Sequence, residues 1–181
     1  MLTHIRPALT LLALFTLLLG LAYPLAITGV AQLAFAHQAN GSPVVIGDHV
    51  IGSDLIGQDF AGDRYFHSRP SAVAYNAAGS GGSNLGPLSQ RLIDRVTADV
   101  AGRQGVPADA VTTSASGLDP DISPANAFTQ VARVAAARGM TPAELTALVQ
   151  AQTAGRLFGL IGEPRVNVLR LNLALDKIAD N

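Results

Sequence analysis

The residues with the clearest chemical potential form a glycine- and serine-rich stretch, Gly79-Ser80-Gly81-Gly82-Ser83-Asn84. Successive glycines let backbone N–H groups converge on an anion, so such a stretch could hold a phosphate. A P-loop also requires Gly-Lys-Ser/Thr at a fixed spacing, and the single lysine of this chain is Lys177. We therefore interpret the stretch as a tight turn that packs against a neighbouring segment.

Ser80 also lies in a near match to the Gly-x-Ser-x-Gly elbow of serine hydrolases, with Ala78 in the place of the first glycine. His67 is the nearest candidate base. An elbow needs a buried strand before its serine, and Val73-Ala74-Tyr75-Asn76 is a poor strand. A membrane-tethered serine hydrolase stays an alternative, and we favour a non-catalytic role for this segment.

Oxygen ligands for a hard cation are present at Asp119 and Asp121, which neighbouring serines accompany. The spacing differs from that of an EF-hand loop, and two carboxylates are few for a dedicated site. The four histidines show no metal-ligand spacing. We therefore predict no metal site and attribute this cluster to helix capping.

Charge and composition exclude several classes of protein. Net charge is −1 over 181 residues, so no basic field is available to neutralise nucleic acid. Cysteine is absent, which excludes a disulfide framework and a thiolate metal site. Hydrophobic residues reach 49% while charged residues are only 14%, and much of this apolar excess lies near the N-terminus.

The elements that must position these side chains begin with a membrane anchor. About 20 apolar residues cross the ~30 Å hydrocarbon core, and residues 9–30 contain no Asp, Glu, Lys, Arg or His. A cleaved signal is the competing interpretation, since Ala34-Phe35-Ala36 resembles a cleavage site, and it would make the chain a free periplasmic binding protein. The apolar run is about twice the ~7 to 15 residues of a signal, so we predict a retained anchor.

Charge asymmetry predicts the orientation of this anchor. Arg6 precedes the span, and the first charge after it is Asp48, so the positive-inside rule places the N-terminus in the cytoplasm. We assign residues 1–8 to a cytoplasmic N-terminus, 9–30 to a transmembrane helix, 31–43 to a linker and 44–181 to an extracytoplasmic domain.

That domain has the pattern of a small α+β fold. β-Branched residues on both sides of residues 47–49 predict a hairpin, and apolar positions at three- and four-residue spacing predict a helix after Pro87. Further predictions are a strand at 111–114, a helix capped by Ser123 and stopped by Gly139, a capping box at 141–144, and a strand around Val166 and Val168. The segment 169–175 fits a strand or a helix.

Five segments together resemble one known family. They are Gly52-Ser53-Asp54-Leu55-Ile56-Gly57-Gln58, Tyr65-Phe66-His67-Ser68-Arg69-Pro70-Ser71-Ala72, Ser80-Gly81-Gly82-Ser83-Asn84-Leu85-Gly86-Pro87, Ser114-Ala115-Ser116-Gly117-Leu118-Asp119-Pro120-Asp121-Ile122-Ser123-Pro124 and Gly162-Glu163-Pro164-Arg165-Val166-Asn167-Val168-Leu169-Arg170-Leu171-Asn172. In this order, behind one N-terminal span, they resemble the C subunit of the Kdp potassium-transporting P-type ATPase.

The resemblance implies an accessory, non-catalytic subunit of a four-part complex in the bacterial inner membrane. Its partners would be a channel-like potassium-binding subunit, the ATP-hydrolysing P-type subunit and a small peptide subunit, which would handle the potassium and the ATP. The family is described as a catalytic chaperone that raises the ATP affinity of the hydrolysing subunit, and it carries an ATP-binding label. An extracytoplasmic domain cannot contact cytoplasmic ATP, so we expect no bound cofactor and an effect transmitted through conformation.

The motif residues supply candidates for packing or interface positions rather than for catalysis. We expect the loop at 65–87 to pack on the channel-like subunit, with the outer domain over the potassium entrance. The candidate positions are Tyr65, Phe66, Arg69, Ser80, Asn84, Asp119 and Arg165.

Overall fold

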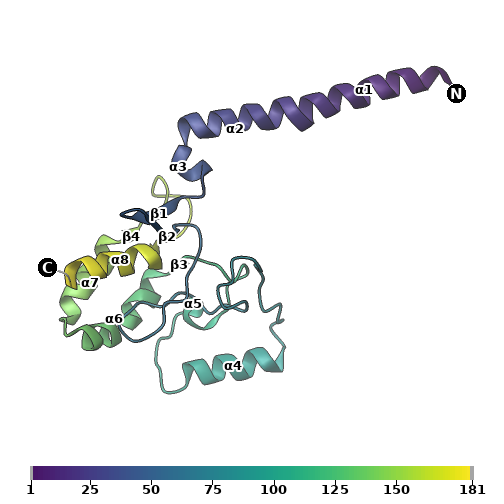
Figure 1. Ribbon diagram of the computed structural model, residues 1–181. Coiled ribbons are helices and arrows are strands. Elements are labelled where there is room, and N and C mark those ends of the chain that lie inside the picture. The colour runs from purple at the N-terminus through teal and green to yellow at the C-terminus, as the bar shows by residue number, and fades with distance from the viewer. Residues whose placement is uncertain (1, 180–181) are drawn as a thin grey trace. The chain divides into compact units, whose positions relative to one another are not determined.

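A computed structural model describes residues 2–179 of the chain. It divides into two compact units at the bond between Pro43 and Val44, and each unit is described by itself. This architecture, one apolar N-terminal helix and a small α+β domain, confirms the predicted fold class (Figure 1).

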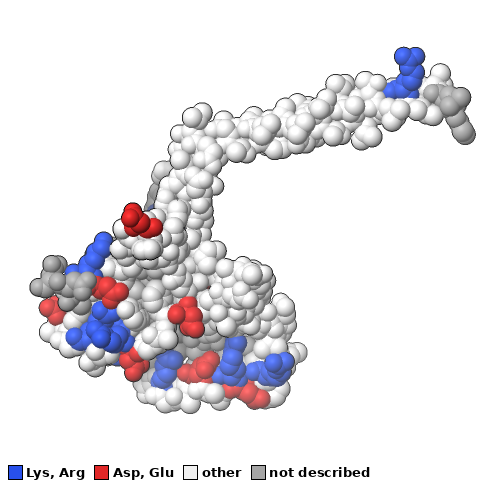
Figure 2. Space-filling view, viewed as in Figure 1, with Lys and Arg blue, Asp and Glu red and all other residues white. Residues whose placement is uncertain are grey.

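The first unit is a long helix over Ile5–Ala34, about 45 Å at 1.5 Å per residue. It is the one helix among residues 2–179 that is long and apolar enough to cross a membrane, and its side chains are almost all exposed. In Figure 2 it is white except near its N-terminus, because no charged residue follows Arg6 within it.

A π-helical segment, Leu18–Ala22, joins α1 (Ile5–Leu17) to α2 (Tyr23–Ala34). It ends at Ala22, two residues before Pro24. Proline has no N–H to donate to the carbonyl four residues earlier, so the ladder of hydrogen bonds must widen there. A short 3-10 turn, Leu2–His4, precedes this helix, and α3 (Ala36–Ala39) follows it.

The second unit combines two small sheets with five helices among its described residues. β1 and β2 form a hairpin, and β3, β5 and β4 form an antiparallel sheet in that order, with Ile122 and Thr153 on either side of Val166. The elements are β1 (Pro43–Ile46), β2 (His49–Ser53), α4 (Gln90–Val100), α5 (Ala108–Val111), β3 (Asp121–Ile122), α6 (Pro124–Arg138), α7 (Pro142–Ala151), β4 (Thr153–Ala154), β5 (Arg165–Asn167) and α8 (Val168–Ala179).

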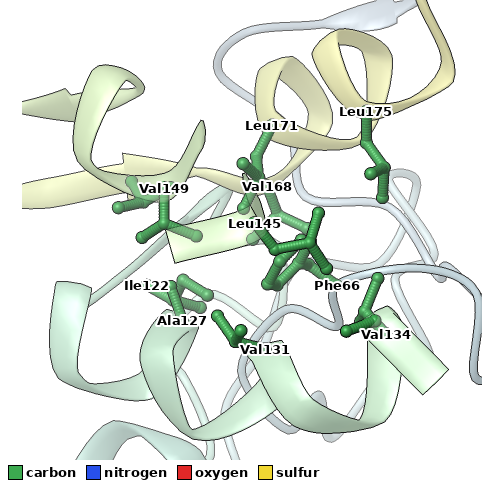
Figure 3. Packing of buried hydrophobic residues seen from close by; sticks show 12 residues of the cluster. Phe66, Ile122, Ala127, Val131, Val134, Leu145, Val149, Val168, Leu171 and Leu175 are labelled. Atoms are coloured by element: carbon green, nitrogen blue, oxygen red, sulfur yellow. The ribbon is translucent and has the colours of Figure 1, made fainter. Parts of the chain in front are cut away.

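The core lies between α6, α7, α8 and the sheet, where their apolar side chains point toward one another (Figure 3). Phe66 is the one aromatic residue in this buried cluster, and it comes from the long loop rather than from a helix or strand. The cluster contains Phe66, Ile122, Ala127, Val131, Val134, Ala135, Leu145, Val149, Val166, Val168, Leu171 and Leu175.

Local capping signals define α6 and α7, as predicted. The Ser123 hydroxyl accepts the N–H of Asn126 at 3.0 Å, and Gly139 ends α6 with a φ of 67°. The Thr141 hydroxyl accepts the N–H of Glu144, while the carboxylate of Glu144 accepts the N–H of Thr141 at 2.8 Å.

Two sequence predictions are wrong in detail. The strand expected at 111–114 is replaced by the end of α5, after which Ser114 donates its N–H to the carbonyl of Pro70 at 3.1 Å instead of to a strand. The strand expected to reach Val168 ends one residue earlier. The Asn167 side chain accepts the N–H of Arg170 at 3.1 Å, so it caps α8 and starts the helix at Val168.

Candidate functional site

The family motifs converge on one feature, the loop of residues 65–87, which we call the motif loop. Its first anchor is Phe66, whose ring is fully buried. The side chain of Asn172 accepts the Phe66 N–H and donates to the Phe66 carbonyl, each at 2.9 Å. This carboxamide satisfies both backbone groups of a residue that lies outside any sheet, as a neighbouring strand would.

The next residue is held in the same way from another helix. The Gln130 side chain of α6 accepts the N–H of His67 at 2.8 Å and donates to the His67 carbonyl at 3.0 Å. Two amides from two helices therefore fix consecutive residues of the motif loop. Because four hydrogen bonds over two residues leave little backbone freedom, the loop begins from a rigid base.

Tyr65 packs on the other side of this base. Its ring centroid lies 5.6 Å from that of Phe60, and the guanidinium carbon of Arg138 lies 4.8 Å above the Tyr65 ring. Arg138 also forms an ion pair with Asp176 at 2.7 Å, and its side chain is only 3% exposed. Tyr65 thus joins the loop to α6 and α8.

The centre of the motif loop is bound to the segment 112–121. Arg69 forms an ion pair with Asp119 at 3.0 Å and donates to the hydroxyl of Thr112 at 3.3 Å. The phenol of Tyr75 donates to the carbonyl of Arg69, and burial raises the pKa of Tyr75. Ser71 donates to the carbonyl of Gly117 at 2.7 Å, so side-chain hydrogen bonds join the motif loop to the segment 112–121 at two places.

Close backbone approach explains the glycines of this region. Gly117 has a φ of 68°, and a Cβ there would lie 2.5 Å from Val73 and 2.7 Å from the carbonyl oxygen of Gly81. A Cβ on Gly57 would lie 2.5 Å from the carbonyl oxygen of Asp119. Within the glycine-rich stretch itself, a Cβ on Gly82 would lie 3.0 Å from the carbonyl oxygen of Ala115, so this glycine packs against a neighbouring segment, as predicted.

Ser80 has no catalytic geometry in this arrangement. Its hydroxyl donates to the carbonyl of Ser116 at 3.0 Å, and Gly81 donates its N–H to the same oxygen at 2.8 Å. The Nε2 of His67 lies 2.9 Å from the carbonyl oxygen of Gly62. The candidate nucleophile and its candidate base therefore each bond to a backbone carbonyl, in different parts of the loop.

The remaining two candidates lie apart from this centre. Asn84 is exposed and has a φ of 52°, which asparagine tolerates better than most residues. Arg165, at the start of β5, forms an ion pair with Asp121 at 3.1 Å. The pKa of Asp121 is nevertheless raised, since burial disfavours its charged form more than the exposed Arg165 guanidinium favours it.

The expected capping role of the two aspartates also differs from the structure. Asp119 and Asp121 form ion pairs, whereas the carboxylate at the start of α6 belongs to Asp109. Asp109 accepts the N–H of Ser123 at 2.8 Å and its hydroxyl at 2.9 Å, and Asn126 donates to it at 3.2 Å. Sequence reasoning missed Asp109 because its hydrogen-bond partner Ser123 lies 14 residues further along the chain.

A polar cleft of about 500 Å³ lies beside the motif loop, and sequence reasoning did not anticipate it. Burial lowers the pKa of Arg133 in its wall. The groups of this wall bond mainly to one another and to the backbone, as when Arg133 donates to the carbonyl of Tyr65 at 3.1 Å. Within residues 2–179 no cluster of three or more His, Asp or Glu side chains could hold a metal ion.

Gln130 and Asn172 are the important residues that sequence reasoning missed. A signal exists for both. Asn172 lies beside Leu171 in the buried stripe of α8, and Gln130 is a half-buried residue beside Val131 at the edge of the stripe of α6. A polar residue in an apolar stripe must find a buried partner. What the sequence does not reveal is that the partner is the motif loop, 63 and 106 residues away.

The fold and the site define a membrane-anchored, single-pass protein whose α+β domain carries a rigid, backbone-bonded loop. The chain matches the family model described as "KdpC: K+-transporting ATPase, c chain" over residues 5–177. It is 63% identical to a protein from Allorhizobium ampelinum named potassium-transporting ATPase KdpC subunit, with 97% of both chains covered. Proteins of the same name from Caulobacter vibrioides and Methylobacterium nodulans are 59% identical (97% of this chain, 94% of theirs) and 56% identical (99% of both). The chain belongs to the KdpC family.

Proposed function

We propose that this protein is the non-catalytic accessory subunit of a high-affinity, ATP-driven potassium uptake complex, which it stabilises. The observation that carries the proposal is the full-length family match together with a motif loop whose polar groups serve its own architecture. A loop built in this way presents a fixed surface to other subunits and leaves Ser80 without a base.

The domain is proposed to lie outside the cytoplasm. Arg6 precedes the long helix, and no Asp, Glu, Lys or Arg follows until Asp48, so the positive charge favours a cytoplasmic N-terminus. On this side of the membrane the domain lies over the potassium entrance, and the motif loop packs on the channel-like, potassium-binding subunit. Asn84, exposed at the end of the loop, is a residue that such a partner would contact.

The same topology determines how the subunit acts on ATP hydrolysis. ATP and potassium are handled by the partner subunits, and this chain raises the ATP affinity of the hydrolysing subunit as a catalytic chaperone. Because the domain and the nucleotide are on opposite sides of the membrane, the effect passes through the long helix or the channel-like subunit. Such a coupling is reciprocal, so ATP binding strengthens the hold of the complex on this subunit.

Two measurements test the proposal. Deleting the chain should abolish growth and potassium uptake at micromolar potassium, and restoring it should recover both; undiminished uptake would exclude the proposed role. For the orientation, the absence of cysteine allows single-cysteine labelling of the full chain in cells. A membrane-impermeant maleimide should label Thr97→Cys in spheroplasts and leave Thr3→Cys unlabelled until lysis. The reverse pattern would place the domain in the cytoplasm.

A further inference from the structure

A second feature of the domain is a strongly apolar turn between β4 and β5, which we call the apolar tip. It consists of residues 157–161, in which Gly159 separates two pairs of large apolar residues. Phe158 is 85% exposed and Leu160 is 82% exposed, while Leu157 and Ile161 are 60% and 64% exposed. Exposed apolar residues in such a compact group mark a contact surface rather than chance exposure.

The apolar tip is a folded structure that holds its side chains outward. Leu157 and Ile161 exchange both backbone hydrogen bonds, at 2.9 and 3.0 Å. Phe158 and Gly159 have φ values of 53° and 74°, which close the turn tightly. Below it, Arg156 forms an ion pair with Glu163 at 2.8 Å. The result is a small convex apolar turn on a charged base.

The base of the apolar tip lies close to the point where the chain enters the domain. β1 and β2 turn at residues 47–48, so Val44 lies across the hairpin from the end of β2. The next residue, Asp54, accepts from the side chain of Asn167 at 2.9 Å through its carbonyl. Asn167 is two residues from Arg165, which pairs with Ala154 below the tip. Figure 1 shows the loop between β4 and β5 on the side of the domain that holds β1 and β2.

The tether between the long helix and the domain is short. The long helix ends at Ala34, and residues 35–43 connect it to Val44. Nine residues reach about 30 Å when fully extended, and α3 shortens that reach. Val44 therefore lies no farther than about 30 Å from the end of the long helix, which keeps the domain within reach of the membrane surface.

We propose that the apolar tip inserts into the interface of the lipid bilayer and orients the domain on the membrane; this inference rests on the anchor of the proposed function. A lipid surface accepts a convex apolar turn without needing a matched socket, and interfacial segments bury their apolar side to ~5 to 10 Å. Arg156 at the base lies at the depth of lipid phosphates. The hairpin of β1 and β2 carries further apolar residues, Val45, Ile46 and Val50, that are each more than half exposed.

The test uses the full chain in lipid nanodiscs that contain phospholipids with brominated acyl chains. Leu157→Cys, labelled with an environment-sensitive dye, keeps Phe158 and Leu160 in place. Its fluorescence should be quenched by brominated lipid at least about twofold relative to ordinary lipid, because bromine quenches only at short range. The same dye on Thr97→Cys, an exposed position of α4, should not be quenched.

A second pair of variants separates insertion from general stickiness. Adding Phe158→Ser and Leu160→Ser to the labelled chain should remove most of the quenching, since each buried apolar side chain changes partition by roughly tenfold or more. Leu88→Ser is the matched control, because Leu88 is 93% exposed at a different place, and it should leave the quenching unchanged.

Two results would overturn the proposal. One is equal fluorescence of the Leu157→Cys label in brominated and ordinary lipid. The other is shielding of the label from aqueous iodide only after the other subunits are added, which would mean that a protein surface covers the apolar tip. Loss of potassium uptake on deleting the whole chain is independent of both results, so the proposed function can stand when the insertion fails.

Discussion

Replacing Asn172 by alanine tests whether the motif loop is held by the buried amide. Asn172 is 1% exposed, and its side chain makes two 2.9 Å hydrogen bonds to the N–H and the carbonyl of Phe66. The substitution removes both partners and leaves two buried backbone groups unsatisfied. At about 1–3 kcal/mol for each such group, the free energy of unfolding should fall by about 2–6 kcal/mol.

The effect should be visible as a shift in thermal stability. For a domain of this size, a loss of about 3 kcal/mol lowers the Tm by roughly 10 °C. The assay is thermal unfolding of the full chain in mild detergent, followed by near-UV circular dichroism, with urea unfolding of the same samples to give the free energy. The loop should also become more sensitive to protease between residues 65 and 87, because Phe66 loses its fixed position.

A matched control keeps the chemistry and changes only the burial. Asn76 is exposed, and its side-chain oxygen accepts one local bond, from the N–H of Ala78 at 3.0 Å. Asn76→Ala should therefore change the free energy of unfolding by no more than about 0.5 kcal/mol. If Asn172→Ala and Asn76→Ala proved equally mild, the buried amide would not hold the loop, and our account of its rigidity would be wrong.

Three further predictions concern the backbone and two carboxylates. Gly117→Ala should lower the free energy of unfolding in urea by about 2–4 kcal/mol, because the new Cβ would clash with its neighbours. Gly105→Ala is the control: Gly105 also has a positive φ but open space around it, so the loss should be about 1 kcal/mol. Equal losses would contradict the close packing at Gly117. Hydrogen bonds from Thr141 hold the pKa of Glu144 below its ordinary 4.5, so the contribution of Glu144 to stability is complete above that pH and is lost as the pH falls through the lowered pKa. Thr141→Ala should therefore reduce the loss of thermal stability between about pH 6 and 3. An unchanged pH profile would argue against the capping box. Burial raises the pKa of Asp121, so the contribution of Asp121 to stability is favourable at low pH and is lost as the pH rises through the raised pKa. At pH 7, Asp121→Asn should therefore leave the free energy of unfolding, measured in urea, equal or higher. A large loss of this free energy would show that the ion pair with Arg165 outweighs the burial.

The sequence predicted best where the signals are local. The caps at Ser123 and at Thr141 with Glu144 act within three residues, so their side chains report the helix starts directly. The apolar helix was equally clear from composition, although the π-helical segment before Pro24 was not specified. The strand predicted at 111–114 was wrong because β-branched residues fit both a strand and an extended segment bonded to a loop.

The sequence motifs identified candidate residues, but they did not reveal which residues contact one another. Arg69 and Asp119 could be named without knowing that they form an ion pair across 50 residues. Phe66 could be named without knowing that it fills the core. Gln130 and Asn172 were missed, because a single amide in an apolar stripe gives no indication of which distant backbone it will satisfy.

The sequence alone therefore determined the long apolar helix, the helices α4, α6 and α7, and the family, because composition, short-range capping and ordered motifs are properties of the chain itself. The tertiary structure decided that the polar groups of the motif loop bond within the domain. Ser80 donates to the carbonyl of Ser116, and side-chain amides from α6 and α8 hold the backbone at the start of the loop. It also decided that Asp54, directly after the hairpin of β1 and β2, is bonded to Asn167 at the end of β5. Both depend on contacts between residues far apart in the chain, and only folding brings those residues within bonding distance.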